Sequence, residues 1–329
     1  MRLVRVHGAG TGLILEADDD RHILDIAAAG AALGVRAPAI SAGVEVLFEG
    51  EQQSWLPMIT QWPQSRETLR SLAELAFDDI RHGRAQLPLY RYQDTRLDPP
   101  LPEPAARIFA MGGNFAAHAS QMSDVMDLPE SITNATPQTA PPWGFYVIPG
   151  TIVGPDAGIT PPVGTKYLDY EAEVAVVLGN HQPGAEPAPV WGYTAWNDFS
   201  IRDAALGVTQ TDHGPLTWSL TKNFRSGNSC GPWMVVNHPP VDNLSITCLV
   251  NGELRQSGNT VQMTHSFTRI ASYISDFVSL GAGDMIVSGT PAGTAMERGF
   301  DGDYLQDGDK VAVVIDGVDA LTNSIHFAG

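Results

Sequence analysis

The sequence predicts a β-dominated α+β protein in which a small β-rich module precedes a larger domain of strands. Short apolar runs, broken by Gly and by acidic turns, recur along most of the chain, whereas only two stretches show clear helical periodicity. At 329 residues the chain is long enough for one large domain with an appendage, or for two domains. We find no internal repeat that would indicate a solenoid.

The first hundred residues, 1–100, are expected to form the small module. Its strand-like runs, "MRLVRVH", "GLILEA" and "HILDIAA", are separated by Gly and by the turn-forming "DDD". Residues 65–83 are predicted to form an amphipathic helix that Ser65 caps and Gly83 ends. Its apolar residues at helical spacing are Leu69, Leu72, Ala73, Ala76 and Ile80. The proline-rich stretch "LPLYRYQDTRLDPPLPEP" indicates an extended linker, so we place a boundary near residue 100.

Residues 101–329 are predicted to form the larger, strand-rich domain. Residues 119–145 are polar and proline-rich without periodicity, which is typical of a loop that covers an active site as a lid. A second helix is predicted over "SFTRIASYISDFVSL", where one face carries Phe267, Ile270, Ala271, Ile274 and Phe277. Gly-Asp turns then lead into apolar strands in "GAGDMIVSGTPAG" and "LQDGDKVAVVIDG".

Charge and cysteine content argue against several classes of function. The formal charge is -18 and no run of Lys or Arg occurs, so we expect no nucleic acid and no anionic membrane as a partner. Two cysteines, Cys230 and Cys248, cannot form a disulfide framework or a thiolate metal cluster. No apolar run approaches the roughly 20 residues that span a membrane, and no charged segment followed by an apolar stretch opens the chain. We therefore expect a cytoplasmic protein.

Three acids stand in the first half of an otherwise apolar run, "YLDYEAEVAVVLG", residues 167–179. Because side chains alternate faces along a strand, Asp169, Glu171 and Glu173 are predicted to share one face. Two carboxylates ~4 Å apart repel by ~4 kcal/mol at an effective dielectric of about 20. Water, a shared proton or a cation could offset this repulsion.

A further acid, Asp198, follows in "GYTAWNDFSIRD" at the predicted end of a strand. Taken alone, Asp198 is expected to cap a helix near Ser200 and Asp203, which fit a capping box. Taken with Glu171 and Glu173, it predicts a site for a hard cation, Mg2+ with Mn2+ or Ca2+ as alternatives. Zinc is disfavoured because no His or Cys lies nearby in the sequence. Alternating acids more often mark a solvated strand face, but the adjoining "VAVVLG" argues against full exposure.

Five ordered motifs of this chain resemble those of the fumarylacetoacetate hydrolase family. They are "YLDYEAEVAVVLG", "GYTAWNDFSIRD", "CGPWMV", "VNGELRQSGNTVQM" and "GDMIVSGTPAG", and the resemblance covers roughly residues 105–328. It implies a mixed β-sandwich roll that forms a homodimer and holds Mg2+, or a similar cation, through E-x-E and a later Asp. Glu171, Glu173 and Asp198 match those metal positions.

The resemblance also implies roles for residues outside the acidic set. "MGGNFAAHASQM" is similar to a family segment ending in H-x-x-E, which makes His118 the expected base or proton shuttle. Lys222 matches a lysine that neutralises substrate charge, and Arg202 matches a position that could bind a carboxylate. Gly289 and Thr290 could present a backbone and a hydroxyl to an anionic group. The structural alternatives are a histidine in a turn, a surface lysine, an arginine ion pair and a strand-ending turn.

The chain departs from the family pattern at four positions. Gln121 stands where the family has a glutamate, and glutamine cannot accept a proton. The His-Glu pair that activates water in family hydrolases is therefore expected to be broken. Ile148 replaces a lysine, Ala205 replaces a glutamine that contacts substrate, and Arg225 replaces an acid. The polarity of the pocket is thus expected to differ, and the resemblance does not assign the substrate.

The resemblance implies a divalent-metal-dependent enzyme that acts on an enolisable 2-oxo acid. The leading expectation is an isomerase of the 2-hydroxyhepta-2,4-diene-1,7-dioate type, because proton transfer needs His118 and the cation but no water-activating glutamate. The alternative is a carbon-carbon hydrolase of a 2,4-dioxo acid, such as an acylpyruvate or fumarylpyruvate, with Asp124 or Glu130 as the replacement acid. A binding protein that has lost turnover is the third hypothesis.

Overall fold

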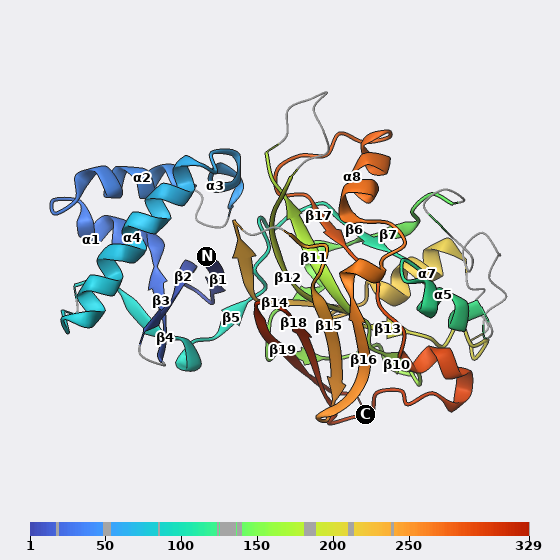
Figure 1. The fold of residues 1–329 in the computed structure, drawn as a ribbon. Helices are drawn as coiled ribbons and strands as arrows, with labels where there is room; N and C mark the ends of the chain where they lie inside the picture. Colours follow the sequence, from blue (N-terminus) through green and yellow to red (C-terminus); the bar gives the residue numbers. More distant parts are fainter. Residues whose placement is uncertain are drawn as a thin grey trace.

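Two β-sheets face each other at the centre of the molecule, and helices lie around them (Figure 1). We describe this fold from a computed structural model. It describes the chain except residues 18–19, 49–53, 85, 124, 126–135, 137–139, 181–188, 210–213, 238–239 and 329. The arrangement confirms the predicted β-dominated α+β class and its mixed sandwich architecture.

The larger sheet has 12 strands and follows the order β4-β3-β2-β1-β14-β12-β11-β17-β6-β7, while β5 pairs with β1 and β8 with β14. Most of its pairs are antiparallel, but β17 with β6 and β14 with β8 are parallel. Its strands are β1 (Arg2–Val6), β2 (Gly10–Ala17), β3 (Asp20–Asp25), β4 (Leu89–Arg91), β5 (Leu97–Asp98), β6 (Ile108–Met111), β7 (Gly144–Val147), β8 (Ile152–Val153), β11 (Ala172–Leu178), β12 (Val190–Asp198), β14 (Asn228–Val236) and β17 (Met285–Val287).

A second sheet of five strands, in the order β16-β15-β18-β19-β9, faces the large sheet, with β15, β18 and β19 against β11, β12 and β14. Its strands are β9 (Gly158–Ile159), β15 (Ser245–Val250), β16 (Glu253–Asn259), β18 (Lys310–Ile315) and β19 (Val318–Ile325). Apolar side chains from both sheets fill one core between them. A separate short pair, β10 (Leu168–Asp169) with β13 (Ser200–Ile201), lies next to the acidic residues.

Helices from the N-terminal part pack against β2 and β3 at one end of the large sheet, and their apolar side chains share a second core with the other face of that sheet. They are α1 (Ile26–Leu33), α2 (Pro38–Phe48), α3 (Leu56–Thr60) and α4 (Gln64–Arg81). The sequence analysis expected only the last of these. The segment α1, "IAAAGAAL", is apolar almost throughout, so it carries no amphipathic period that would reveal a helix. The predicted linker also forms structure, because β4 pairs with β3 and β5 with β1.

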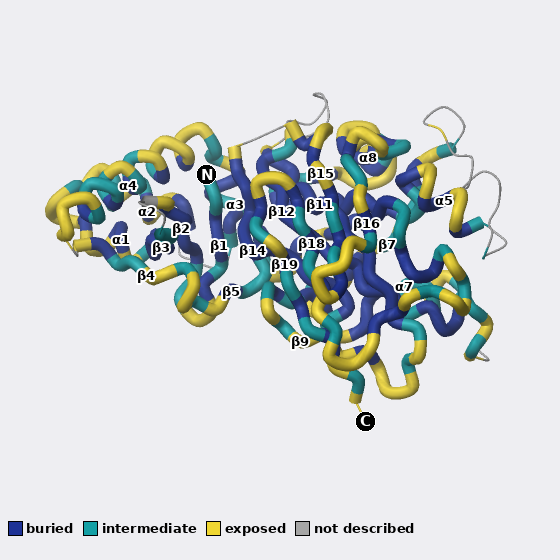
Figure 2. The backbone as a smooth tube through the Cα atoms, turned by 60° about the horizontal axis from the view of Figure 1, so that its bottom comes forward, coloured by how far each residue is buried: buried dark blue, intermediate teal, exposed yellow. Residues whose placement is uncertain are grey.

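The strand β11 is buried on both faces, which explains its continuous apolar run. Val174 and Val176 belong to the core between the two sheets, whereas Ala175 and Val177 belong to the core beneath the N-terminal helices. Figure 2 shows this central part of the large sheet as buried and the helices at the surface as alternating between buried and exposed. Because both faces exclude water, the acids at the start of this strand are held in a low-dielectric environment.

Several predicted helix ends differ from those observed. The helix α4 begins at Gln64, and Ser65 is buried with its hydroxyl donating to the Gln61 carbonyl at 3.1 Å, so it does not cap the helix. Gly83, with φ +62°, follows the helix end as predicted. The second predicted helix, α8 (Phe267–Ser275), is capped by Ser266 but ends before Phe277, whose side chain is 75% exposed.

Other connections also differ from the expectation. The predicted helix after Asp198 is absent, since Ser200 begins strand β13 and its hydroxyl donates to the Asp198 carbonyl at 3.0 Å. The predicted loop 119–145 contains the end of helix α5 (Ala116–Ser123), and most of its remainder lies outside the described residues. The remaining elements are α7 (Pro215–Lys222) and the short 3-10 helices η1 (Tyr92–Asp94), η2 (Pro149–Thr151), η3 (Thr260–Gln262) and η4 (Ala295–Asp301).

Among the helices of the described residues, none combines the length and apolar character needed to cross a membrane.

Candidate active site

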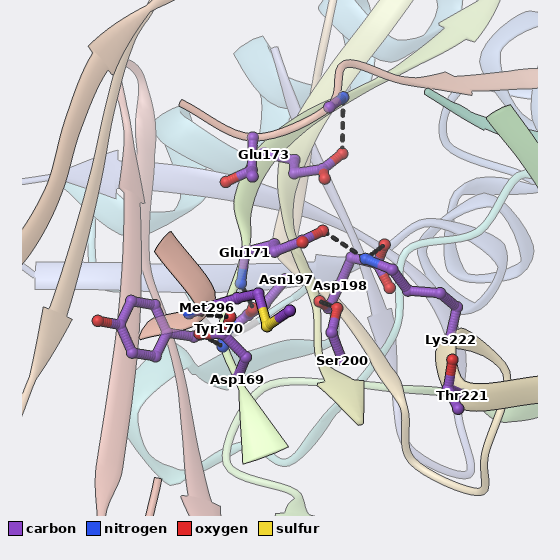
Figure 3. Close-up of polar contacts among 12 residues, drawn as sticks. Asp169, Tyr170, Glu171, Glu173, Asn197, Asp198, Ser200, Thr221, Lys222 and Met296 are labelled. Carbon is purple, nitrogen blue, oxygen red and sulfur yellow. Dashed lines mark hydrogen bonds and ion pairs between the residues drawn. The ribbon is translucent and has the colours of Figure 1, made fainter. Parts of the chain in front are cut away.

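Three carboxylates meet where β11 and β12 lie side by side. One ligand oxygen from each of Glu171, Glu173 and Asp198 lies within 4.8 Å of the other two, and all three residues are buried. Strand pairing produces this arrangement, because Ala172 pairs with Asn197 and the N–H of Asp198 donates to the Glu171 carbonyl at 3.0 Å. Figure 3 shows the group beside Lys222. The predicted metal residues are therefore brought together.

The run that carries these acids is two strands, not the single strand predicted over 167–179. The N–H of Tyr170 donates to Oδ1 of Asp169 at 2.9 Å, and the N–H of Glu171 donates to Oδ1 of Asn197 at 3.0 Å. Side chains thus accept hydrogen bonds from two backbone N–H groups that would otherwise pair with a neighbouring strand. The strand is therefore interrupted between β10 and β11.

Asp169 lies apart from the other acids and has a different set of partners. Its carboxylate accepts hydrogen bonds from the backbone N–H groups of Ala295 and Met296 at 2.8 and 3.1 Å, and from Nε of Arg202 at 3.0 Å. Arg202 also donates to Glu171. The arginine therefore joins Asp169 to the acidic group, and its predicted contact with a substrate carboxylate stays a prediction.

Lys222 lies among the acids rather than on the surface. Its Nζ atom is 2.5 Å from Oε2 of Glu171 and 2.9 Å from Oδ2 of Asp198. The residue is the last of α7, and burial leaves it only 4% exposed. Burial lowers the pKa of Lys222, but Asp198 and Glu171 outweigh burial, and the net pKa is raised. The lysine thus stays charged and offsets part of the acidic charge.

Burial and mutual repulsion raise the pKa of two carboxyls in this group. Burial raises the pKa of Asp198 to about 7; Glu171 adds to the rise, whereas Lys222 opposes it. Burial, followed by Asp198 and Glu171, raises the pKa of Glu173 well above its usual range. Burial also disfavours the charged form of Glu171, but Lys222 and Arg202 outweigh it and bring the pKa to about 2. Without a cation, protons on Glu173 and Asp198 therefore relieve the repulsion.

The donor set fits a hard divalent cation. Oδ1 of Asp198 is buried and has no hydrogen-bond partner among the described residues. An orphaned carboxylate oxygen beside two further carboxylates is the oxygen-only environment that Mg2+ and Mn2+ prefer. Glu171, Glu173 and Asp198 are thus the residues that would hold such an ion.

His118 has a carboxylate partner that the sequence analysis missed. Its Nδ1 atom lies 2.6 Å from Oε1 of Glu297 in η4, and both side chains are buried. The other carboxylate oxygen of Glu297 accepts the N–H of Gly293 at 2.8 Å. The prediction that the His-Glu pair is lost is therefore wrong. Gln121 is exposed, and Glu297 from another element is the carboxylate partner of His118. The proposed substitutes Asp124 and Glu130 lie outside the described residues.

A sequence signal for Glu297 did exist. The residue lies four positions after Gly293 in the loop that follows "SGTPAG", a motif already assigned to the site. The expected replacement acids, Asp124 and Glu130, are close to His118 in the sequence, whereas Glu297 is not. Proximity in the fold, not in the chain, supplied the partner.

Gly289 and Thr290 support the acidic strand through hydrogen bonds. The N–H of Gly289 donates to Oε2 of Glu173 at 2.8 Å, and φ of +80° at this residue favours glycine. The Thr290 hydroxyl donates to the Ala172 carbonyl at 3.0 Å and accepts from Nε2 of Gln256 at 2.8 Å. Of these two residues, Thr290 lines the cavity described next, and their predicted substrate contacts stay predictions.

A cavity of about 370 Å³ opens over this group. Glu171, His118, Arg202, Lys222 and Thr290 line it. The remaining lining is largely apolar and comes from α5, α7, the strands β6, β7 and β13, and the segments next to them. His118, which is paired with Glu297, and Glu171 of the three buried carboxylates thus line one cavity, which is the arrangement of an active site.

Comparison with known proteins assigns the family. The family model for the fumarylacetoacetate (FAA) hydrolase C-terminal domain matches residues 107–326, more than half of the chain. The chain belongs to the fumarylacetoacetate hydrolase family. It is 33% identical over 234 residues to the 4-hydroxyphenylacetate degradation bifunctional isomerase/decarboxylase of Escherichia coli. These 234 residues cover 69% of this chain and 48% of that protein. The chain therefore spans about half the length of this bifunctional relative.

Another curated relative is similar over more of its length. The oxaloacetate tautomerase YisK of Bacillus subtilis (strain 168) is 32% identical over 247 residues, which cover 72% of this chain and 75% of that protein. The family contains isomerases, tautomerases and hydrolases and is metal-dependent, so this member of the family is an enzyme.

Solved structures support the same fold over the full chain. A putative HpcE protein from Mycobacterium smegmatis has a TM-score of 0.71 at 25% identity, with 100% of both chains covered. Maleylpyruvate hydrolase from Sphingobium sp. SYK-6, solved with a manganese (II) ion and pyruvate, has a TM-score of 0.65 at 21% identity, again with 100% of both chains covered. At that identity the second similarity supports the fold alone.

Proposed function

We propose that this protein catalyses keto-enol or double-bond isomerisation of a 2-oxo acid, in the manner of 2-hydroxyhepta-2,4-diene-1,7-dioate isomerases. The observation that carries the proposal is that His118, which is paired with Glu297, and the metal-ligand candidate Glu171 line one cavity. Relatives named as an isomerase/decarboxylase and as an oxaloacetate tautomerase support this reaction class.

Proton transfer at C3 of the substrate is the work assigned to His118. Its Nδ1 atom is engaged by Glu297, so Nε2 is the nitrogen that takes the proton from C3 and returns it to the 2-oxo oxygen in keto-enol isomerisation, or to another carbon in double-bond isomerisation. Glu297 fixes the ring orientation and stabilises the imidazolium formed at that moment. Both side chains are buried, which strengthens the electrostatic interaction between them.

The carboxylate group supplies the electrostatic half of the reaction. Glu171, Glu173 and Asp198 would hold a divalent cation, Mg2+ by preference and Mn2+ or Ca2+ otherwise, which would supply Lewis-acid stabilisation of negative charge on the 2-oxo group. Lys222 and Arg202 add two fixed positive charges at the edge of the cavity, where they favour binding of the 2-oxo acid carboxylate.

A carbon-carbon hydrolase of a 2,4-dioxo acid is the second candidate, and one observation favours it. The His118–Glu297 pair restores the histidine and carboxylate combination that activates water, which the replacement at Gln121 had seemed to remove. Such a hydrolase would use Nε2 of His118 to deprotonate water instead of C3.

One experiment distinguishes these candidates. The purified protein with Mg2+ is incubated in D2O with oxaloacetate, phenylpyruvate and 2,4-dioxo acids, and NMR follows the carbon skeleton and deuterium at C3. C3 exchange faster than in a protein-free control, or double-bond migration, with an intact skeleton supports the isomerase, while hydrolytic fragments of the 2,4-dioxo acids support the hydrolase. Bound Mg2+ without either change contradicts both and indicates a binding protein without turnover.

The same proposal includes the oligomeric state, the cellular location and the partners of the enzyme. The family resemblance supports a homodimer, and the charge of -18 with no Lys or Arg run supports a cytoplasmic enzyme without a nucleic-acid or membrane partner. We also propose that the two parts of the chain on either side of residue 100 have different roles. Residues 101–329 contain all candidate site residues, and residues 1–100 contribute strands β1 to β5 to the large sheet and the helices of its second core.

A further inference from the structure

One wall of the cavity is made of aromatic rings. Trp143 precedes β7, Phe145 lies in β7 and Trp218 lies in α7. The ring centroid of Trp218 is 5.3 Å from that of Trp143 and 5.0 Å from that of Phe145. All three rings line the cavity, and Met111 and Met122 extend the apolar surface. We call Trp143, Phe145 and Trp218 the aromatic wall.

The aromatic wall is fixed by the backbone around it. The N–H of Gly112 donates to the Trp143 carbonyl at 3.0 Å. A Cβ atom at residue 112 would lie 2.7 Å from two carbons of the Trp143 ring, so only glycine allows the ring to lie against this turn. Phe145 pairs with Ala110 across β6 and β7. Trp143 and Phe145 therefore belong to the folded scaffold, and Trp218 packs against both of them.

The positive groups of the cavity are all committed to carboxylates. Among the described residues that line it, the cationic or protonatable side chains are His118, Arg202 and Lys222. His118 is paired with Glu297, and the other two each contact Glu171 and one more acid. Nζ of Lys222 lies 5.7 Å from the ring centroid of Phe145. The charged side chains of the cavity and the aromatic wall therefore meet at these two residues.

From this division we propose that the substrate is a 2-oxo acid whose far end is an uncharged aryl or branched alkyl group, not a second carboxylate. This inference rests on the proposed function, since it assumes that the 2-oxo acid end of the substrate is held beside Glu171, Glu173 and Asp198. A distal carboxylate against the aromatic wall would lose water without gaining a cationic partner from the described part of the cavity lining. An aryl ring would instead bury apolar area and stack on Trp218.

The size of the cavity agrees with such a substrate. A volume of about 370 Å³ is at the small end of ligand pockets and accommodates one ring joined to a short 2-oxo acid. The chemistry therefore differs from that of a 1,7-dioate, which carries a carboxylate at each end. The enzyme would follow a reaction that releases an aryl- or alkyl-substituted 2-oxo acid or its enol.

Two inert probes test the inference by binding alone. N-phenyloxamate and N-oxalylglycine share the carboxylate and the adjoining carbonyl, cannot enolise, and end in an aryl ring and a carboxylate respectively. Calorimetric titration of the full chain with saturating Mg2+ should show N-phenyloxamate binding about tenfold or more tightly. Trp218→Ala should remove most of that preference and leave the affinity for N-oxalylglycine unchanged.

Tyr146→Ala is the matched control, because Tyr146 is the next residue of β7, is 65% exposed and does not line the cavity. Trp143→Ala is a second variant in case Trp218→Ala lowers the melting temperature into the assay range. Equal or tighter binding of N-oxalylglycine overturns the inference, as does an equal loss of both affinities in Trp218→Ala. An aryl preference without C3 exchange in any substrate overturns the proposed function but supports this assignment of the cavity.

Discussion

Nδ1 of His118 lies 2.6 Å from Oε1 of Glu297, although 179 positions separate the two residues in the chain. Helix α5 supplies the histidine and η4 supplies the acid, and these two elements are in contact. A glutamate one helical turn after the histidine is therefore not needed for a histidine–carboxylate pair. The fold has supplied that carboxylate from a different segment.

Glu297→Gln should lower kcat about 10- to 100-fold while leaving KM and the Mg2+ affinity nearly unchanged. The amide keeps the shape of the side chain but no longer stabilises the imidazolium that forms during proton transfer. Steady-state kinetics with C3 exchange as the readout checks this expectation. Glu297→Asp should recover part of the rate, and Gln121→Ala, at an exposed position, is the control. Normal kcat in Glu297→Gln would remove Glu297 from the reaction.

Glu173→Gln should abolish Mg2+ binding without loss of stability. Glu173 accepts the Gly289 N–H, which an amide oxygen also accepts, and its raised pKa shows that its charged form is disfavoured before a cation binds. The variant should therefore melt at the same temperature as the wild type or higher in EDTA. Calorimetric titration with Mg2+ and thermal melting give the two readouts. Wild-type Mg2+ affinity in this variant would contradict the site.

Glu171→Gln is expected to behave differently from Glu173→Gln. Glu171 is the shared partner of Arg202 and Lys222, both of which are buried. Removing its charge leaves two buried cations with incomplete pairing, and we expect a loss of about 3 kcal/mol in the free energy of unfolding. Urea denaturation of both variants side by side measures the difference. Equal stability of the two would show that these ion pairs contribute little.

Mg2+ affinity should rise with pH across neutrality. Burial raises the pKa of Asp198 to about 7, and burial with its acidic neighbours also raises that of Glu173, so the metal-free site holds protons near neutral pH. A cation must displace them, and each released proton strengthens binding by about tenfold per pH unit while the pH is below the relevant pKa. Affinity therefore falls as the pH drops below about 7. Titrations in buffers of different ionisation enthalpy count the protons released; release of none at pH 6.5 would contradict the expected protonation.

Trp55→Ala should destabilise the protein by about 3–5 kcal/mol without changing the Mg2+ affinity. Trp55 is fully buried, donates from Nε1 to the Thr11 hydroxyl at 2.8 Å and contacts Trp191 of β12 with ring centroids 6.1 Å apart. It therefore joins the N-terminal helices to the back of the large sheet. Denaturation of the full chain, compared with Tyr90→Ala as an exposed control, tests this stabilising role of residues 1–100.

The sequence alone predicted the metal-ligand candidates because their geometry follows from local rules. Glu171 and Glu173 are two positions apart beside an apolar strand, and Asp198 ends the next strand, so alternation and strand pairing suffice to bring the three together. The predicted helices α4 and α8 likewise rest on amphipathic periodicity, which is a local property. By contrast, α1 to α3 were missed because short or uniformly apolar helices carry no such period.

Only the tertiary structure decided which distant groups meet. Alternation along one strand predicted Asp169 on the same face as the other acids. The strand is interrupted at Tyr170, however, and Asp169 instead accepts hydrogen bonds from Arg202 and from two backbone N–H groups of η4. The pairing of His118 with Glu297 and the stacking of Trp143 on Trp218 depend on contacts between elements far apart in sequence. Alternation and helical period act over a few residues, whereas these contacts are fixed by how sheets and helices pack, which no local pattern encodes.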